Sequence, residues 1–122
     1  MDSVEEFKRY RERLNNRIVS GGNLRIKQFF ALDSRAFEKG VLEAKIKELM
    51  GLVASTVLRC NDCITYHVIR CVEEGVTDKE FFEAFNVALV VGGSITIPHV
   101  RRAVDVLDQC REQMRTEYVE KP

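Results

Sequence analysis

Residues 48–67 decide how this chain folds, and they read ELMGLVASTVLRCNDCITYH. The first half, residues 49–58, is apolar on almost every side of a helix, and Gly51 and Ser55 are small enough to let a neighbouring element approach closely. A helix that is apolar all round is buried inside a protein or an assembly. We therefore expect a long, buried helix over residues 41–58.

The second half of this stretch changes character at residues 59–62. Asn61 and Asp62 are residue types that favour helix N-caps, so we expect a break here and a new helix through His67 to about Glu74. The cysteine-bearing helix can then fold back along the apolar one.

The rest of the chain also has helical periodicity, with no convincing alternating strand. A charged amphipathic helix is expected to end near residues 21–22, and residues 23–40 are less regular, which predicts a short helix and loops. Residues 77–80, TDKE, form a capping-box sequence for a helix to about residue 91. Pro98 suits the first turn of a last helix, with a tail that frays from Thr116.

These elements predict one all-α helical bundle. We expect a single domain over residues 1–122, with an N-terminal helix in residues 1–22 and a core in residues 41–115 that contains the CxxC helix. The chain has 122 residues, enough for one core and too few for two ordinary domains. A domain of this size has little surface of its own to cover so continuous an apolar helix, which favours a homo-oligomer.

Composition narrows the classes of partner. Lys+Arg and Asp+Glu both number 19 and Trp is absent, so no net field favours nucleic acid. Residues 1–6 lack the layout of a signal peptide, and no apolar run reaches the roughly 18 residues that span a bilayer. We expect a cytoplasmic protein that binds neither nucleic acid nor membrane, in a compartment that keeps thiols reduced.

The motif Cys60-Asn61-Asp62-Cys63, with His67 four residues on, carries the chemistry. In a reducing compartment a CxxC is more often catalytic or metal-binding than structural. On one helix, Cys60, Cys63 and His67 would share a wedge of about 60°. A histidine there can take or give the proton that turns a thiol into the reactive thiolate.

Glu48 is the second candidate for proton chemistry. It lies twelve residues before Cys60, at the edge of the apolar stretch, and a fold-back near residues 59–62 lets it reach the cysteine helix. A partly desolvated carboxylate would suit a proton acceptor. The alternative is a surface ion pair with Lys45 or Lys47.

These motifs together resemble a known family. The stretches at residues 43–51, 60–67, 74–77 and 91–93 are similar to the carboxymuconolactone decarboxylase family, and in particular to its alkyl hydroperoxidase D-like branch, which has a CxxC. The Glu-x11-Cys-x2-Cys-x3-His spacing is specific, and the similarity covers about residues 29–110.

The resemblance implies an all-α fold assembled into trimers or hexamers. It also implies a thiol-dependent peroxidase or disulfide oxidoreductase that acts on a small hydroperoxide or disulfide, with Glu48, Cys60, Cys63 and His67 as catalytic residues. No bound cofactor is implied; an external dithiol donor, such as a lipoyl group or a thioredoxin-like protein, would return the electrons. The best-known members have a histidine where this chain has Asp62, which implies a shorter relay, a water-assisted relay or a different substrate.

Other interpretations stay open. The decarboxylase branch would act on a lactone acid, with Arg59, Arg101 or Arg102 to hold a carboxylate, but it needs no cysteine pair. A zinc site would use Cys60, Cys63 and His67, with Glu48 or Cys71 as the fourth ligand. A non-enzymatic scaffold is the third. Spacing alone leaves open which cysteine attacks.

Several other residues are more simply explained by packing or solvent. Cys71 and Cys110 fall on apolar helix faces, which predicts core packing. His99 is expected at a surface or an interface, and Tyr66 points about 100° away from His67, towards a pocket or a subunit contact. Arg11 belongs to a run of helix charges interpreted as solvated surface.

Overall fold

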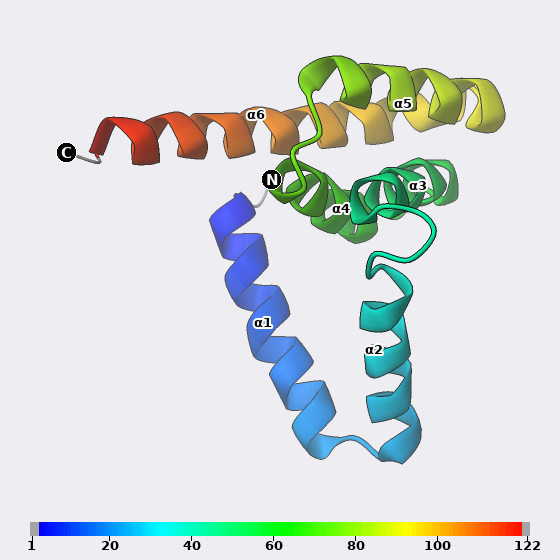
Figure 1. The fold of residues 1–122 in the computed structure, drawn as a ribbon, viewed down its shortest axis with the longest axis vertical. Coiled ribbons are helices and arrows are strands. Elements are labelled where there is room, and N and C mark those ends of the chain that lie inside the picture. The colour runs from blue at the N-terminus through cyan, green and yellow to red at the C-terminus, as the bar shows by residue number, and fades with distance from the viewer. Residues whose placement is uncertain (1–2, 121–122) are drawn as a thin grey trace.

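Every regular element between residues 3 and 120, the part of the chain that the computed structural model describes, is helical. Six α-helices and one 3₁₀ turn follow in order (Figure 1): α1 (Val4–Gly21), α2 (Leu24–Ala36), α3 (Ala44–Leu58), α4 (Asn61–Glu73), α5 (Asp78–Gly92), η1 (Ser94–Thr96) and α6 (Ile97–Glu120). The predicted all-α fold class is confirmed. Residues 1–2 and 121–122 of the predicted domain lie outside the described part.

The core lies where four helices meet. α3 packs against α4 and α5, and α4 packs against α6. The side chains that fill the space between them are apolar and almost fully buried: Leu52, Ile64, Val68, Cys71, Phe81, Phe85, Ala103, Val106, Leu107 and Cys110. Burying one large side chain of this kind contributes roughly 1.5–3 kcal/mol. The core therefore fixes α3 and α4, the two helices that carry the motif residues.

Side-chain caps explain where several helices begin. The Thr77 hydroxyl accepts from the Glu80 N–H at 3.2 Å, and the Glu80 carboxylate accepts from the Thr77 N–H at 2.9 Å, so the predicted capping box is present. Asn23 caps α2 in the simpler way, through an acceptor 3.2 Å from the Ile26 N–H. These bonds satisfy donors that the first turn of a helix leaves free.

The structure differs from the sequence expectations in four places. Residues 24–36 form one regular helix of 13 residues, where a short helix and loops were expected over residues 23–40, and α3 begins at Ala44 instead of residue 41. The N-cap of α4 is Cys60, not Asn61 or Asp62. The last helix does not fray at Thr116 and continues to Glu120.

Helices α1 and α2 extend away from the other four as two legs of a hairpin (Figure 1). The start of α1 is anchored, because Val4 is buried and its N–H donates to Gln109 Oε1 of α6 at 2.8 Å. Helix α2 has no buried residue, although it carries Phe29 and Leu32, which are 67% and 63% exposed. The hairpin thus presents apolar side chains that the rest of the chain does not cover.

A second uncovered apolar surface lies on α3 and α5. We call it the α3–α5 face, and it consists of Ile46, Leu49, Met50, Val53, Ala54, Val57, Leu58, Val87 and Val91. The predicted all-round apolar helix is therefore buried on one side only within a single chain. Between residues 3 and 120, no helix combines the length and hydropathy needed to cross a membrane.

Candidate redox site

The site is built on the tight turn between α3 and α4. Arg59 ends α3 in the left-handed conformation, with φ 60° and ψ 40°, and its N–H bonds to the carbonyls of Ser55 and Thr56. The Cys60 N–H then donates to the Ser55 carbonyl at 3.1 Å. This closure satisfies the Ser55 and Thr56 carbonyls in the last turn of α3 and reverses the chain, so α4 runs back along α3.

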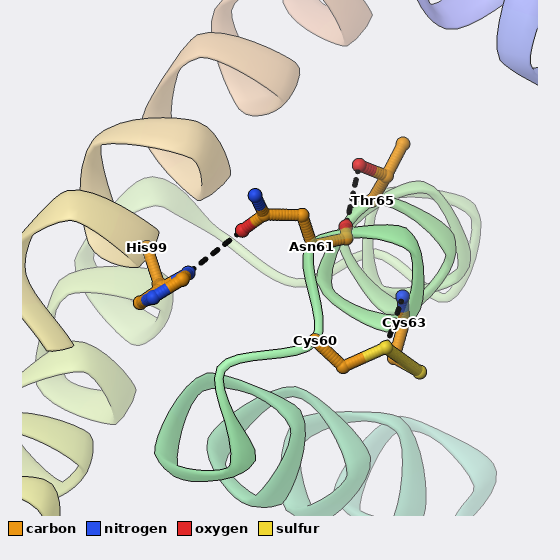
Figure 2. Close-up of a disulfide and its surroundings, with 5 residues drawn as sticks. All are labelled: Cys60, Asn61, Cys63, Thr65 and His99. Carbon is orange, nitrogen blue, oxygen red and sulfur yellow. Dashed lines mark hydrogen bonds between the residues drawn. A yellow bond between two sulfur atoms is a disulfide. The ribbon is translucent and has the colours of Figure 1, made fainter.

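Cys60 and Cys63 are joined by a disulfide at the start of α4 (Figure 2), with their Cα atoms 5.3 Å apart. As the N-cap, Cys60 accepts through Sγ from the Cys63 N–H at 3.3 Å. Cys63 is exposed and Cys60 is half-buried. The pair sits at the positive end of a helix dipole, where a thiolate is stabilised.

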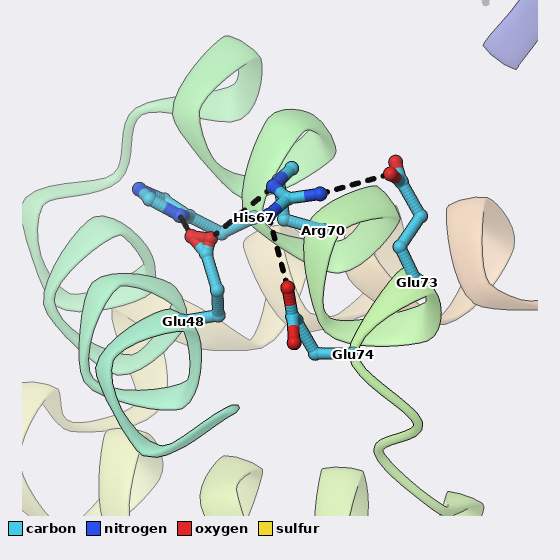
Figure 3. Close-up of polar contacts among 5 residues, drawn as sticks. All are labelled: Glu48, His67, Arg70, Glu73 and Glu74. Atoms are coloured by element: carbon cyan, nitrogen blue, oxygen red, sulfur yellow. Dashed lines mark hydrogen bonds and ion pairs between the residues drawn. The ribbon is translucent and has the colours of Figure 1, made fainter. Parts of the chain in front are cut away.

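Glu48 and His67 meet across the two helices (Figure 3). His67 Nδ1 lies 3.3 Å from Glu48 Oε1, and the two residues are only 9% and 1% exposed. An ionised carboxylate can only accept, so a neutral His67 bound to it donates through Nδ1 and keeps Nε2 as an acceptor. The arrangement is an oriented imidazole on α4, the helix that begins at the disulfide, backed by a buried carboxylate from α3.

Small and aromatic neighbours hold the His67 ring in place. Gly51 of α3 lies so close that a Cβ added there would be 2.7 Å from His67 Cε1. The rings of Phe37 and Tyr66 lie on the other sides, with centroids 5.1 and 5.2 Å from that of His67. The close approach predicted for Gly51 is therefore made, and its partner is the histidine.

We expect Gly51→Ala to displace the His67 ring, because the new Cβ would also lie 2.9 Å from both ring nitrogens. Overpacking costs about 1–3 kcal/mol, and alanine in mid-helix returns about 0.5–1 kcal/mol, so the fold should survive. Because a misplacement of about 1 Å can cost 10²-fold, formation of the disulfide from the reduced cysteine pair should slow by at least about tenfold.

The measurement is the rate of disulfide formation in Gly51→Ala, together with the His67 ring shifts in NMR spectra. Gly40→Ala is the matched control, since the nearest atom to its added Cβ is Lys47 Nζ at 3.6 Å, an ordinary contact. A Gly51→Ala protein that forms the disulfide as fast as the unmodified chain would show that the ring position is not required.

Arg70 is a site residue that the sequence analysis missed. It lies one turn beyond His67, with Nε 3.8 Å from Glu48 Oε2, and it also pairs with Glu73 and Glu74. Burial acts to lower the pKa of Arg70, but the surrounding carboxylates, Glu73 and Glu48 first, outweigh it and raise that pKa. A signal existed: in an antiparallel pair that turns at residue 59, Glu48 and Arg70 both lie about 15 Å from the turn.

Cys63 and His67 open onto a cleft of about 420 Å³. Its other wall comes mainly from α1, through residues that are mostly apolar: Phe7, Tyr10, Arg11, Leu14, Asn15 and Ile18, with Asp33, Asp62 and Tyr66 completing the lining. The Arg11 guanidinium lies 4.0 Å from the centroid of the Tyr66 ring, a cation–π contact. Tyr66 thus lines a pocket, as expected, whereas the interpretation of Arg11 as solvated surface is wrong.

The other two cysteines are buried in the core, as predicted. Burial, reinforced by the Glu48 charge, raises the pKa of the Cys71 thiol to about 12. Burial also raises the pKa of Cys110. Both thiols stay protonated near neutral pH, and neither belongs to the site.

The alternative interpretation of Glu48, a surface ion pair with Lys45 or Lys47, is wrong. Lys45 pairs with Glu80 at 2.8 Å, and Lys47 donates to the carbonyls of Ala36 and Glu38, so neither lysine reaches Glu48.

His99 was expected at a surface or an interface. Its Nδ1 lies 2.7 Å from Asn61 Oδ1, next to the cysteine pair (Figure 2). Within residues 3–120, no three His, Cys, Asp or Glu side chains are grouped so as to hold a metal ion.

Fold and site together define a helical protein with a CxxC disulfide beside a buried carboxylate–histidine pair. The model of the carboxymuconolactone decarboxylase family matches residues 26–106. A curated relative, the uncharacterized protein 4 in the cox locus of Paracoccus denitrificans, is 32% identical over 81 residues, which is 66% of this chain and 73% of the relative. The chain belongs to the carboxymuconolactone decarboxylase family.

Solved structures agree with this membership. A crystal structure of TM1620 from Thermotoga maritima is 56% identical, with a TM-score of 0.90 over 92% of this chain and 98% of that one. A second TM1620 structure, of a family protein with a suggested involvement in an antioxidative response, is 57% identical, with a TM-score of 0.87 over 91% of this chain and 94% of that one. The fold is shared with lpg0406 of Legionella pneumophila, at 20% identity and a TM-score of 0.80 over 87% of this chain and 95% of that one.

Proposed function

We propose that this chain is a thiol-dependent peroxidase or disulfide oxidoreductase that cycles Cys60 and Cys63 between dithiol and disulfide. The observation that carries the proposal is the placement of an exposed cysteine beside the buried Glu48–His67 pair, at the rim of a cleft. An antioxidative role suggested for the similar TM1620 protein is consistent with this chemistry.

Cys63 is the better placed of the two cysteines to attack. It is exposed and lines the cleft with His67, whereas Cys60 is half-buried as the N-cap and does not line the cleft. Residues 63 and 67 are one helical turn apart, so their side chains are neighbours on α4. We therefore assign the attack to Cys63 and the resolving step to Cys60.

In the first step, His67 takes the Cys63 thiol proton, and Glu48 stabilises the imidazolium that forms. The thiolate attacks the terminal oxygen of a hydroperoxide. An S–O bond forms and the O–O bond breaks, so sulfur is oxidised to a sulfenic acid while the peroxide leaves as an alcohol after taking a proton. His67 is the source of that proton.

In the second step, the Cys60 thiol displaces water from the sulfenic acid and the disulfide forms. A dithiol donor, a lipoyl group or a thioredoxin-like protein, then reduces this disulfide by thiol–disulfide exchange and is itself oxidised. A cytoplasm that keeps thiols reduced would supply such a donor. No bound cofactor takes part in either step.

The cleft favours organic substrates over hydrogen peroxide. Its α1 wall contributes aromatic and aliphatic side chains such as Tyr10, Leu14 and Ile18, while Arg11 is the cation in the lining. An apolar substituent on the peroxide or disulfide would be removed from water against this wall, at roughly 25 cal/mol per Å² of apolar surface buried.

The experiment that tests the function is peptide mapping by mass spectrometry of the fully reduced protein after one equivalent of cumene hydroperoxide, with free thiols blocked. The proposal requires rapid formation of the Cys60–Cys63 disulfide, with Cys71 and Cys110 recovered in blocked form. If all four thiols remain reduced towards the hydroperoxide and towards a small organic disulfide, the redox proposal fails.

We also propose that the chain works as a homo-oligomer, a trimer or a hexamer. The uncovered apolar surfaces of the hairpin and the α3–α5 face support this, since monomeric proteins rarely leave such continuous apolar patches exposed. Light scattering after size exclusion should give three or six times the chain mass of 14.0 kDa. We expect the double variant Val87→Asp, Val91→Asp to have a lower mass, because both substitutions place charges in the α3–α5 face. Val41→Asp is the control, since Val41 is exposed outside this face, and it should not change the mass. A monomeric parent protein would contradict the proposal.

A further inference from the structure

The Arg70 guanidinium lies within 4 Å of three carboxylates beside the site (Figure 3). Arg70 donates to Glu73 Oε2 at 2.9 Å and to Glu74 Oε1 at 3.1 Å, and both bonds are within one helix, at spacings of three and four residues. Its third nitrogen, Nε, faces Glu48 Oε2 from 3.8 Å. The two shorter contacts occupy the ends of the guanidinium, and only the longer one is directed towards the site.

Glu48 Oε2 is buried, and no side chain or backbone group in residues 3–120 donates a hydrogen bond to it. A separation of 3.8 Å is beyond hydrogen-bond range, so Arg70 reaches this oxygen through its charge alone. Buried carboxylate oxygens normally have partners, and one without a donor needs an explanation. Here the oxygen is an unused acceptor next to a histidine that must pass on a proton.

We infer that Arg70 is a positioning residue that keeps Glu48 ionised, and that Glu73 and Glu74 hold its guanidinium just short of a hydrogen bond to Glu48 Oε2. The carboxylate is then charged enough to stabilise a protonated His67, yet one of its oxygens stays free to accept a proton. This inference deepens the proposed function, because it concerns the proton relay of the same site.

Among the charged side chains near Glu48, Arg70 is the cation placed to keep this carboxylate ionised. On α3, the helix that carries Glu48, Lys45 pairs with Glu80 of α5, and Lys47 bonds to backbone carbonyls. On the α4 side, Glu48 faces His67, Arg70 and the protonated Cys71 thiol. Glu73 and Glu74 pair with the same Arg70 guanidinium, and a nearby cation favours the ionised form of a carboxylate.

The inference predicts opposite effects for two sets of variants. In Arg70→Gln, Glu48 loses its cation, so the acidic limb of the pH profile for disulfide formation should move to higher pH, by about one unit. In Glu73→Gln with Glu74→Gln, the guanidinium is free to approach Glu48, and the limb should move to lower pH. Arg70→Lys keeps the charge, so its acidic limb should move upward less than that of Arg70→Gln.

A merely structural role for Arg70 would slow the reaction without moving the limb, or would move it the same way in both sets. Glu83→Gln, an exposed carboxylate on α5, is the matched control and should move nothing. The triple variant that combines Arg70→Gln with both glutamines should behave like Arg70→Gln alone. An additional downward shift in the triple variant would overturn the clamping role of Glu73 and Glu74.

A second readout does not depend on activity. The Glu48 carboxyl carbon is titrated by ¹³C NMR in the oxidised protein and identified by its absence in Glu48→Gln. Opposite displacements of its midpoint in the two sets support the inference even if no hydroperoxide is reduced, in which case only the proposed function fails. An unchanged midpoint in both sets overturns the inference even if the protein is an active peroxidase. If Arg70→Gln does not fold, the midpoint in Glu73→Gln with Glu74→Gln is the test: a downward shift supports the inference, and an unchanged midpoint overturns it.

Discussion

Cys63→Ser is expected to abolish hydroperoxide reduction, whereas Cys60→Ser should still reduce one equivalent and then stop. A serine hydroxyl at position 63 cannot supply the thiolate, and losing the nucleophile should cost about 10³-fold or more in rate. With serine at position 60, Cys63 can still attack, but its sulfenic acid has no thiol with which to condense. The half-buried and exposed environments of the two cysteines are the reason for this asymmetry.

Single-turnover consumption of cumene hydroperoxide measures both variants, and dimedone labelling followed by mass spectrometry locates the sulfenic acid. Cys71→Ala is the control, because that thiol is buried and protonated and should not affect turnover. Labelling at Cys60 in the Cys63→Ser variant, with a full burst, would reverse our assignment of the attacking cysteine. An equal burst in both single variants would show that the two cysteines do not have separate attacking and resolving roles.

Glu48→Gln is expected to slow disulfide formation by about 10²- to 10⁴-fold, the usual contribution of positioned acid–base groups. The amide oxygen can still accept from His67 Nδ1, so the ring keeps its orientation, but no charge remains to stabilise the imidazolium. The substitution also turns an amide NH₂ donor towards the Arg70 guanidinium, where Oε2 lay, so we expect a loss of about 1–3 kcal/mol of stability.

Stopped-flow oxidation of the reduced pair, combined with thermal unfolding, separates these two effects. Glu83→Gln provides the same chemical change at an exposed position and should leave the rate unchanged. A Glu48→Gln protein that forms its disulfide at the parent rate would show that the buried carboxylate is not part of the relay.

Much of the fold could be predicted because apolar periodicity and caps are local signals. The break at residues 59–62 and the capping box at Thr77 and Glu80 are properties of adjacent residues, and both are present. Helix α2 was underestimated for a physical reason: none of its residues is buried within the chain, so its apolar residues follow no single core-facing stripe. The left-handed residue that ends α3 is Arg59, and it could not be predicted because the usual sequence signal for this conformation is a glycine.

The same distinction applies to the candidate site. Cys60, Cys63 and His67 were recognisable from spacing, and Glu48 from the expected reversal of the chain. Arg70 was missed although the same reversal places it level with Glu48, because within α4 it has the pattern of an ordinary surface ion pair with Glu73. Pattern analysis finds residues that share a helix face more readily than residues that meet across helices.

The burial of Cys71 and Cys110 means that thiol–disulfide exchange in the proposed cycle would involve one two-electron couple, the Cys60–Cys63 pair. With the pKa of Cys71 at about 12 and that of Cys110 also raised, mild oxidants can reach only the Cys60–Cys63 pair. Its equilibrium with a glutathione buffer is then described by one midpoint potential, with a tenfold change in the ratio of oxidised to reduced protein for every shift of about 30 mV. The ratio of oxidised to reduced pair would then follow the surrounding thiol–disulfide poise without a contribution from the buried thiols of Cys71 and Cys110.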